Sequence, residues 1–288
     1  HMAMKKESYN AREAGIAQRY YTMMGKVKLT YAGTKDFPHT TRWSTSRLYF
    51  RSPNGITFSG HEGAKSFILP FKGEASVQVA EMRGITSSAD FVVAKGSATL
   101  FGTALESDGG VIIDNFSLRG ASGQTLADLP ETTLKEFSKT RPYDLIIIQY
   151  GVNAVTEKST ASQLKTYMKE MRKVVEHLKR GFPQASILVA GAPDRGSKTA
   201  QDGTMPAIKM LSGLQEQLAS DTKVGFLSIL GAMGGPGTMR RIVDEHGWGS
   251  KDYVHINWDG GKFVANRLFK SFLCGYDNYV RRKKIENQ

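Results

Sequence analysis

The apolar pattern of the chain changes near Gly120, and this change limits the fold more than any other feature. Upstream of Gly120, short runs rich in β-branched and aromatic residues recur between turn residues, which predicts a β-sandwich or jelly roll. These runs cover residues 27–31, 47–51, 56–59, 67–71, 75–80, 91–93, 99–101 and 111–116.

Downstream of Gly120, helical and extended patterns alternate. Residues 143–150 (YDLIIIQY) form a near-continuous apolar run, which is typical of a buried parallel strand. The alternation predicts a three-layer α/β domain with a parallel sheet. The expected strands are 143–150, 186–191 and 224–230, and the expected helices are 126–138, 161–180, 206–220 and 259–274.

Composition excludes several classes of protein. Hydrophobic residues make up 40% of the 288, enough for a sizeable core, and the single Cys274 excludes an internal disulfide framework and a cysteine-based zinc site. No apolar run approaches the ~20 residues of a membrane-spanning helix. The net charge of +12 favours a polyanionic partner such as an acidic glycan, a cell-wall polymer or nucleic acid, or it reflects only a basic, solvated surface.

Three loops at the expected carboxyl ends of strands carry residues suited to chemistry, because ligands of open α/β sheets bind at that edge. Gly120 and Gly123 precede a helix, where backbone N–H groups can face a ligand, although a tight turn would need the same residues. Asn153 follows the long apolar run and can place an amide donor over the sheet edge or cap the next helix. Asp252 lies three residues before His255 and can orient its imidazole through Nδ1, a spacing that is also common by chance.

Together, the three loops resemble blocks two, three and five of the SGNH/GDSL hydrolase family, across residues 111–279. The resemblance implies a flavodoxin-like α/β/α fold. It also implies that the Gly120 N–H and the Asn153 Nδ2 form an oxyanion hole, and that Asp252 and His255 are two members of a Ser-His-Asp triad. His255 would then take the serine proton and return it to the leaving alcohol. Ester cleavage of this kind needs no metal and no cofactor.

The nucleophile of the triad is not identified. The family's first block is a strand ending in Gly-Asp-Ser, and this chain contains neither that tripeptide nor a Gly-x-Ser-x-Gly elbow. Ser122 lies in the second block, and Ser44 and Ser46 lie in the β-rich half without a strand-to-helix turn. We therefore expect the serine to lie upstream or on another polypeptide, and the chain alone to be nearly inactive.

The order of the two halves is similar to one branch of the family, the peptidoglycan and polysaccharide O-acetylesterases, which insert a β-sandwich similar to a carbohydrate-binding module between blocks one and two. We therefore expect a tag remnant and helical lead-in at 1–25, the β-sandwich at 26–112, the hydrolase domain at 113–279 and a basic tail at 280–288. Trp43, Tyr49 and Phe50 could stack on sugar rings or pack in the core of the sandwich.

The resemblance implies an esterase that removes O-acetyl or other short acyl groups from a cell-envelope glycan such as peptidoglycan, in the periplasm or outside the cell. The positive net charge suits an anionic polymer. Two alternatives stay open: a glycan-binding protein that has lost catalysis, and an O-acyltransferase that uses the same acyl-enzyme. Nucleic-acid binding has only the net charge in its favour, and the histidine spacing indicates no metal site.

Overall fold

The computed structural model describes residues 10–286, and the predicted tag remnant at the start of the chain lies outside the described residues. The chain divides into two compact units. The first unit contains residues 10–119, 125–143 and 180–183, and the second contains residues 120–124, 144–179 and 184–286. Each unit is described by itself.

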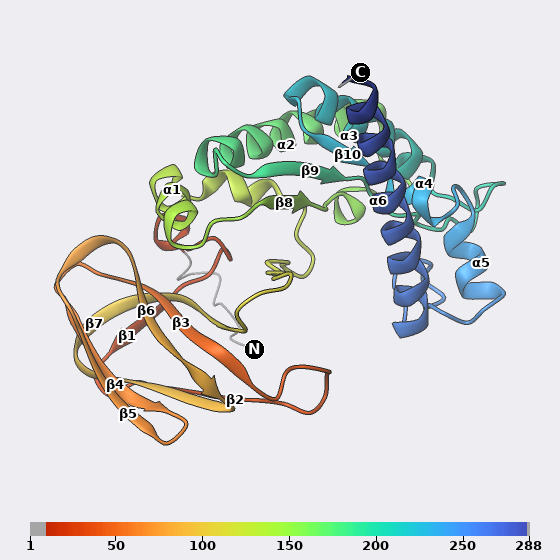
Figure 1. Cartoon of the computed structure of the whole chain (residues 1–288). Coiled ribbons are helices and arrows are strands. Elements are labelled where there is room, and N and C mark those ends of the chain that lie inside the picture. The colour runs from red at the N-terminus through yellow and green to blue at the C-terminus, as the bar shows by residue number, and fades with distance from the viewer. Residues whose placement is uncertain (1–9, 287–288) are drawn as a thin grey trace. The chain divides into compact units, whose positions relative to one another are not determined.

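The first unit is built on antiparallel strands that all connect through one long strand, β7 (Ser88–Glu106). The first part of β7 pairs with β4 and β2, and the second part pairs with β3 and β1, as Figure 1 shows. The other strands are β1 (Tyr21–Met24), β2 (Lys28–Ala32), β3 (Trp43–Ser52), β4 (Ile56–Glu62), β5 (Lys65–Phe71) and β6 (Glu74–Thr86). The pattern predicted this strand class correctly, but it split β7 into two runs and missed β1.

An aromatic core fills the first unit. Phe50, Phe58 and Phe91 are fully buried, and the ring of Phe58 meets those of Phe50 and Phe91 edge-on at centroid distances of 5.1 and 6.4 Å. Trp43 and Tyr49 are also buried. Core packing is therefore the correct interpretation of these aromatic residues, and stacking on sugar rings is excluded for Trp43, Tyr49 and Phe50.

The strand predicted at residues 111–116 is absent, and that prediction is wrong. Residues 111–118 have no regular secondary structure, and Val111 and Ile113 are 89% and 83% exposed. Apolar, β-branched residues form a strand only where a neighbouring strand takes up their backbone hydrogen bonds, and no described strand pairs with this segment. The segment is held instead at Asp114, which accepts hydrogen bonds from Arg141 and Tyr143.

Helix α1 (Glu131–Thr140) belongs to the first unit, so the unit boundary differs from the predicted one between residues 112 and 113. Leu134 and Phe137 are buried, and the Phe137 ring packs on Phe101 and Tyr49 at 5.5 and 6.1 Å. Two short 3₁₀ turns, Ala11–Glu13 and Gln124–Asp128, complete the connections. The helix starts at Glu131 rather than at residue 126 because Pro130 occupies its N-cap position with extended backbone.

The second unit contains a parallel sheet with the strand order β10-β9-β8. The strands are β8 (Leu145–Ile148), β9 (Ser186–Ala190) and β10 (Gly225–Leu227), and the helices are α2 (Ala161–Gly181), α3 (Pro206–Thr222), α4 (Ile229–Met233), α5 (Thr238–Asp244) and α6 (Trp258–Glu286). The predicted alternation of strands and helices is confirmed here. β10 is shorter than predicted because Ser228 caps α4 through a hydrogen bond from the Gly231 N–H.

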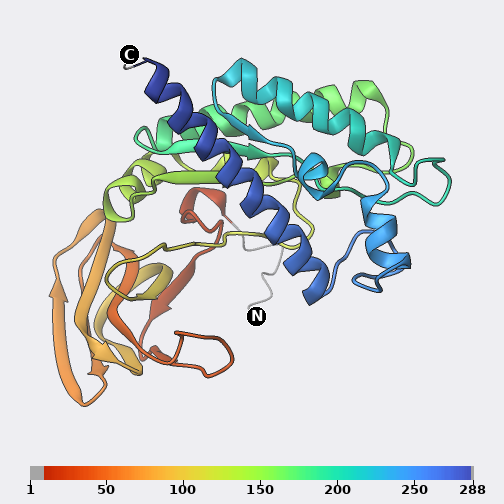
Figure 2. The same ribbon diagram turned by 45° about the vertical axis from the view of Figure 1, so that its right-hand side comes forward.

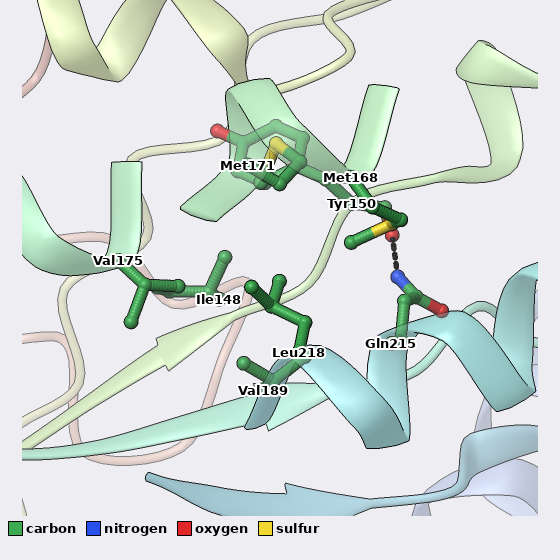
Figure 3. A pocket seen from close by; sticks show the side chains of 8 residues that line it. All are labelled: Ile148, Tyr150, Met168, Met171, Val175, Val189, Gln215 and Leu218. Carbon is green, nitrogen blue, oxygen red and sulfur yellow. Dashed lines mark hydrogen bonds between the residues drawn. The ribbon is translucent and has the colours of Figure 1, made fainter. Parts of the chain in front are cut away.

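The two faces of this sheet are covered by different helices. Ile148 and Val189 point toward α2 and α3, where they line a void of about 10 Å³ together with Met171, Val175 and Leu218 (Figure 3). The next residue of β9, Ala190, faces the other side and packs in a cluster with α4, α5 and the start of α6. Figure 2 shows α6 passing across this second face. The arrangement is the three-layer α/β architecture that the pattern predicted.

β8 is an edge strand, because β9 is the only described strand that pairs with it. Leu145 and Ile147 share the α6 face with Ala190, and they are 44% and 52% exposed. The strand itself was predicted correctly, but the expectation that it is buried on both faces is wrong. Burial on both faces requires cover that the described residues do not provide at this edge.

Helix α6 has 29 residues and continues through Glu286, so the described part of the predicted basic tail at 280–288 is helical. Several apolar side chains on α6 are exposed, among them Phe269, Phe272 and Leu273. Within residues 10–286, no helix combines the length and the hydropathy that a membrane span requires.

Candidate active site

Asp252 and His255 form a hydrogen-bonded pair on the loop before α6. The Asp252 Oδ2 lies 2.7 Å from the His255 Nδ1, and the Asp252 Oδ1 accepts the backbone N–H groups of Val254 and His255 at 2.9 and 3.1 Å. The bond from His255, together with the two backbone donors, lowers the pKa of Asp252 to about 2. An ionised carboxylate on Nδ1 leaves the Nε2 of His255 as the atom that can take and return a proton.

The backbone fixes this loop locally. Tyr253 adopts a left-handed conformation (φ +56°), and the Ser250 N–H donates to the His255 carbonyl at 2.8 Å. Asn257 then caps α6 by accepting the N–H groups of Asp259 and Gly260, both at 3.1 Å. His255 therefore stands just before a helix N-terminus, with 78% of its side chain exposed.

Asn153 lies in a 3₁₀ turn, Val152–Ala154, directly after β8. Its Nδ2 donates to the Ala121 carbonyl at 3.2 Å, so the structure brings Asn153 together with the loop that contains Gly120. The Gly120 N–H has no acceptor among residues 10–286, and Gly120 has a φ of +77°. Both predicted oxyanion donors therefore lie on adjacent, exposed loops.

A buried glutamine connects the ends of two strands beneath these loops. The Gln215 Nε2 donates to the Tyr150 carbonyl at 2.8 Å (Figure 3). Its Oε1 accepts the Ala192 N–H, also at 2.8 Å. Gly151 has a φ of +129°, and a Cβ at this position would lie 2.8 Å from a methyl group of Leu211. Gly151 is thus required both by its backbone conformation and by close packing.

Residues 194–196 connect the Asn153 turn to the Asp252–His255 loop. The Arg195 Nη1 donates to the carbonyls of Val152 and Val155, each at 2.9 Å, and the Gly196 N–H donates to the Tyr253 carbonyl at 2.9 Å. The adjacent Asp194 is buried and accepts the Thr204 hydroxyl and the Met239 N–H, both at 2.8 Å. One segment after β9 therefore holds both loops at the same edge of the sheet.

A cavity of about 320 Å³ opens at this edge. Asp252, Arg195 and Glu157 line it, so it borders the histidine loop, the connecting segment and the residues that follow the Asn153 turn. The sequence-predicted residues Gly120, Asn153, Asp252 and His255 all belong to the second unit.

The serines considered as nucleophiles are bonded to groups other than His255. The Ser122 hydroxyl donates to Gln124, and the buried Ser46 hydroxyl donates to Glu62 and accepts from Trp43. Ser44 accepts the Asp108 N–H. Within the described residues, no serine hydroxyl forms a hydrogen bond with His255. The same range also contains no group of three or more His, Cys, Asp or Glu side chains able to hold a metal ion.

Sequence reasoning gave no role to two residues of this site. Gln215 has a signal that could have revealed it, since it is a polar residue on the apolar face of a helix. Arg195 stands in a stretch, 192–195, that resembles the same family branch, but its role has no signal in the sequence, because its partners are carbonyl groups about 40 residues away that only the fold brings near.

The chain is similar to several known proteins. Residues 85–262 match the model of the GDSL-like lipase/acylhydrolase family. The structure of a peptidoglycan O-acetylesterase superimposes with a TM-score of 0.64 at 17% identity, covering 91% of this chain and 78% of that one. A lipase/acylhydrolase from Enterococcus faecalis (TM-score 0.34, 16% identity, 49% and 68% coverage) and an acetyl xylan esterase (0.35, 16%, 49% and 75%) match less of the chain. No curated protein sequence matches it.

Proposed function

Because this chain belongs to the GDSL-like lipase/acylhydrolase family, we propose that it is the larger part of an esterase that removes O-acetyl groups from a cell-envelope glycan such as peptidoglycan. The Asp252–His255 pair at an edge shared with Asn153 is the observation that carries this proposal. The fold match to a peptidoglycan O-acetylesterase supports the substrate class, and a net charge of +12 suits an anionic polymer. This substrate would place the protein in the bacterial cell envelope.

The proposed reaction uses a serine hydroxyl as the nucleophile. The His255 Nε2 takes the hydroxyl proton while the oxygen attacks the acetyl carbonyl, and the Gly120 N–H and Asn153 Nδ2 stabilise the oxyanion. The proton then passes to the sugar oxygen, which leaves as an alcohol. Water, deprotonated by the same nitrogen, hydrolyses the acyl-serine and releases acetate.

We further propose that this serine is supplied by a polypeptide segment that pairs with the open edge of β8. The exposed side chains of Leu145 and Ile147, together with one unpaired strand edge, support such a segment as a further parallel strand. Since β8 leads directly into the Asn153 turn, the carboxyl end of a neighbouring parallel strand would lie beside the oxyanion donors. The β-rich first unit would then serve as the inserted carbohydrate-binding-like module.

Acetate release from O-acetylated peptidoglycan, measured with the complete product of the gene, tests the activity. We expect His255→Ala to reduce kcat by about 10⁴-fold or more. His61→Ala is a matched control, because His61 also pairs with an aspartate, Asp90, but in the first unit. Equal losses in both variants, or no loss in His255→Ala, would refute the assigned site.

A fluorophosphonate probe, which labels activated serines, tests where the nucleophile lies. We expect the 288-residue chain alone to stay unlabelled, and the complete gene product to be labelled at a serine outside these residues. Labelling of a serine within the 288 residues would show that the proposed source of the nucleophile is wrong.

A further inference from the structure

The cavity beside Asp252 contains more polar groups than the acyl-transfer reaction uses. Its volume is about 320 Å³, at the lower end of the range for small-molecule pockets and sufficient for one sugar-sized group. Besides Asp252, its walls include Glu157, Arg195, Lys198 and Thr199. The reaction described above assigns no role to these four side chains.

Arg195 has one edge of its guanidinium group engaged and another edge without partners. Both protons of Nη1 are directed to backbone carbonyls, those of Val152 and Val155. The Nε is buried and has no acceptor within residues 10–286, and Nη2 has none in the same range. Nε and Nη2 form the side of the guanidinium that binds a carboxylate with two parallel hydrogen bonds. A buried cationic donor without an acceptor is unusual, and here the residue that carries it lines a cavity.

Two cationic side chains, Arg195 and Lys198, and two acidic ones, Asp252 and Glu157, line the cavity. Asp252 is negative, but its two oxygens already accept three hydrogen bonds from its own loop. Lys198 is exposed and forms no ion pair within the described part of the chain. Besides Asp252, Glu157 is the acidic side chain that lines the cavity together with Arg195 and Lys198.

We propose that this cavity is a subsite for a carboxylate carried by the glycan, bound side-on by Nε and Nη2 of Arg195 and attracted by Lys198. The glycan part of this assignment rests on the proposed function, whereas preference for an acid rests on the cavity alone. The subsite would select esters on sugars that bear a carboxylate, or that are linked to a sugar bearing one. Arg195 would then both position the Asn153 turn and recognise the substrate.

Two pairs of small probes test the preference for an acid with the 288-residue chain. N-acetylmuramic acid is compared with N-acetylglucosamine, and methyl β-glucuronide with methyl β-glucoside. Each pair shares a ring. The acid of the first pair carries an added lactyl ether with its carboxylate, and the acid of the second has a carboxylate in place of the hydroxymethyl group. Binding is followed by the NMR signals of the Arg195 Nε–H and of the Gly196 and Lys198 amides. We expect one acid to bind at least about tenfold more tightly than its neutral partner.

Three lining variants sharpen this test, two of them at Lys198 and Glu157, which do not hold the loops. Lys198→Ala should weaken binding of the acid several-fold, and Glu157→Gln should strengthen it, because it removes a like charge. Lys165→Ala removes the same charge from an exposed position on α2 and should change nothing. Arg195→Lys keeps the charge but removes the Nε and Nη2 donors, so it should abolish the preference for the acid. Unchanged amide signals of residues 152–155 would show that the turn is intact in this variant.

The outcomes separate this proposal from the proposed function. Acids and neutral sugars that bind equally, or signals near Arg195 that do not move with any probe, would overturn the subsite even if the complete gene product releases acetate. Conversely, acid-selective binding without acetate release would keep the subsite and refute the esterase.

Discussion

β7 in the first unit is paired along both of its edges, whereas β8 in the second unit is paired along one. The first sheet surrounds a core in which Phe50, Phe58 and Phe91 are fully buried, while Leu145 and Ile147 of the second remain about half exposed. The loops with candidate catalytic residues follow the open sheet. The first sheet therefore encloses its core, whereas the second has one open edge beside its candidate catalytic residues.

Phe58→Ala should give the largest effect on folding, because the closed core of the first unit leaves no room to relax. We expect a loss of about 3–5 kcal/mol in the free energy of unfolding, measured by urea denaturation. Phe37→Ala removes the same side chain from an exposed position (58%) and should cost less than about 0.5 kcal/mol. Similar losses in the two variants would mean that the first unit is not closely packed.

Gln215→Leu should cost about 1–3 kcal/mol, because it removes the side chain that bonds both the part-buried Tyr150 carbonyl and the buried Ala192 N–H. Such a loss would show that the hydrogen bonds connecting the ends of β8 and β9 stabilise the second unit, although one edge of its sheet is open. Gln217→Leu, two residues away on the surface of α3, is the control, since its amide bonds only to the exposed Asp221. If Gln215→Leu has no greater effect than Gln217→Leu, the buried glutamine does not connect the strands.

The titration of Asp252 should show whether the histidine loop is organised in the chain by itself. The carboxyl ¹³C signal should titrate near pH 2 in the chain alone, and in His255→Ala the midpoint should rise toward the ordinary value of 3.8. Because the pKa is lowered in the folded state, the contribution of this group to stability is present above pH 3.8 and is lost as the pH falls through 2. A midpoint near 3.8 in the unmutated chain would mean that the pair forms only when a further segment binds.

Ile147→Lys should have the smallest effect on the chain alone, below about 0.5 kcal/mol, because the side chain is already 52% exposed. In the complete gene product the same change should greatly reduce acetate release, because it places a charge where the proposed strand packs. Lys165→Ala, on the surface of α2, should leave both quantities unchanged. Full activity of Ile147→Lys would place the serine-bearing segment elsewhere.

The sequence predicts well the features that depend on nearby residues, and poorly those that depend on pairing between distant segments. The apolar spacing of residues 161–180 defines α2 almost to the residue, and Asp252 and His255 are close enough in sequence to meet in one turn. The spacing of apolar residues does not show whether a segment pairs with a neighbouring strand. Residues 111–116 and 143–150 have similar apolar runs, but the second pairs with β9 and the first has no described partner.

Positions that depend on tertiary contacts also escape sequence reasoning. Gln215 forms hydrogen bonds with the ends of two strands, and Arg195 donates hydrogen bonds to carbonyl groups of a turn that is distant in the sequence. The roles assigned to Gly120, Asn153, Asp252 and His255 come from the family resemblance, and they stay predictions until the variants above are measured.

Helix α6 has a consequence for handling the protein. Phe269, Phe272, Leu273 and Tyr276 are between 43% and 64% exposed on one helix, beside a cationic end that carries Arg281 and Arg282. Apolar side chains presented in this way adsorb to detergents, to plastic and to one another, and the nearby positive charges oppose self-association only while salt is dilute. We therefore expect the chain to be monodisperse in low-salt buffer and to form soluble aggregates as ionic strength increases.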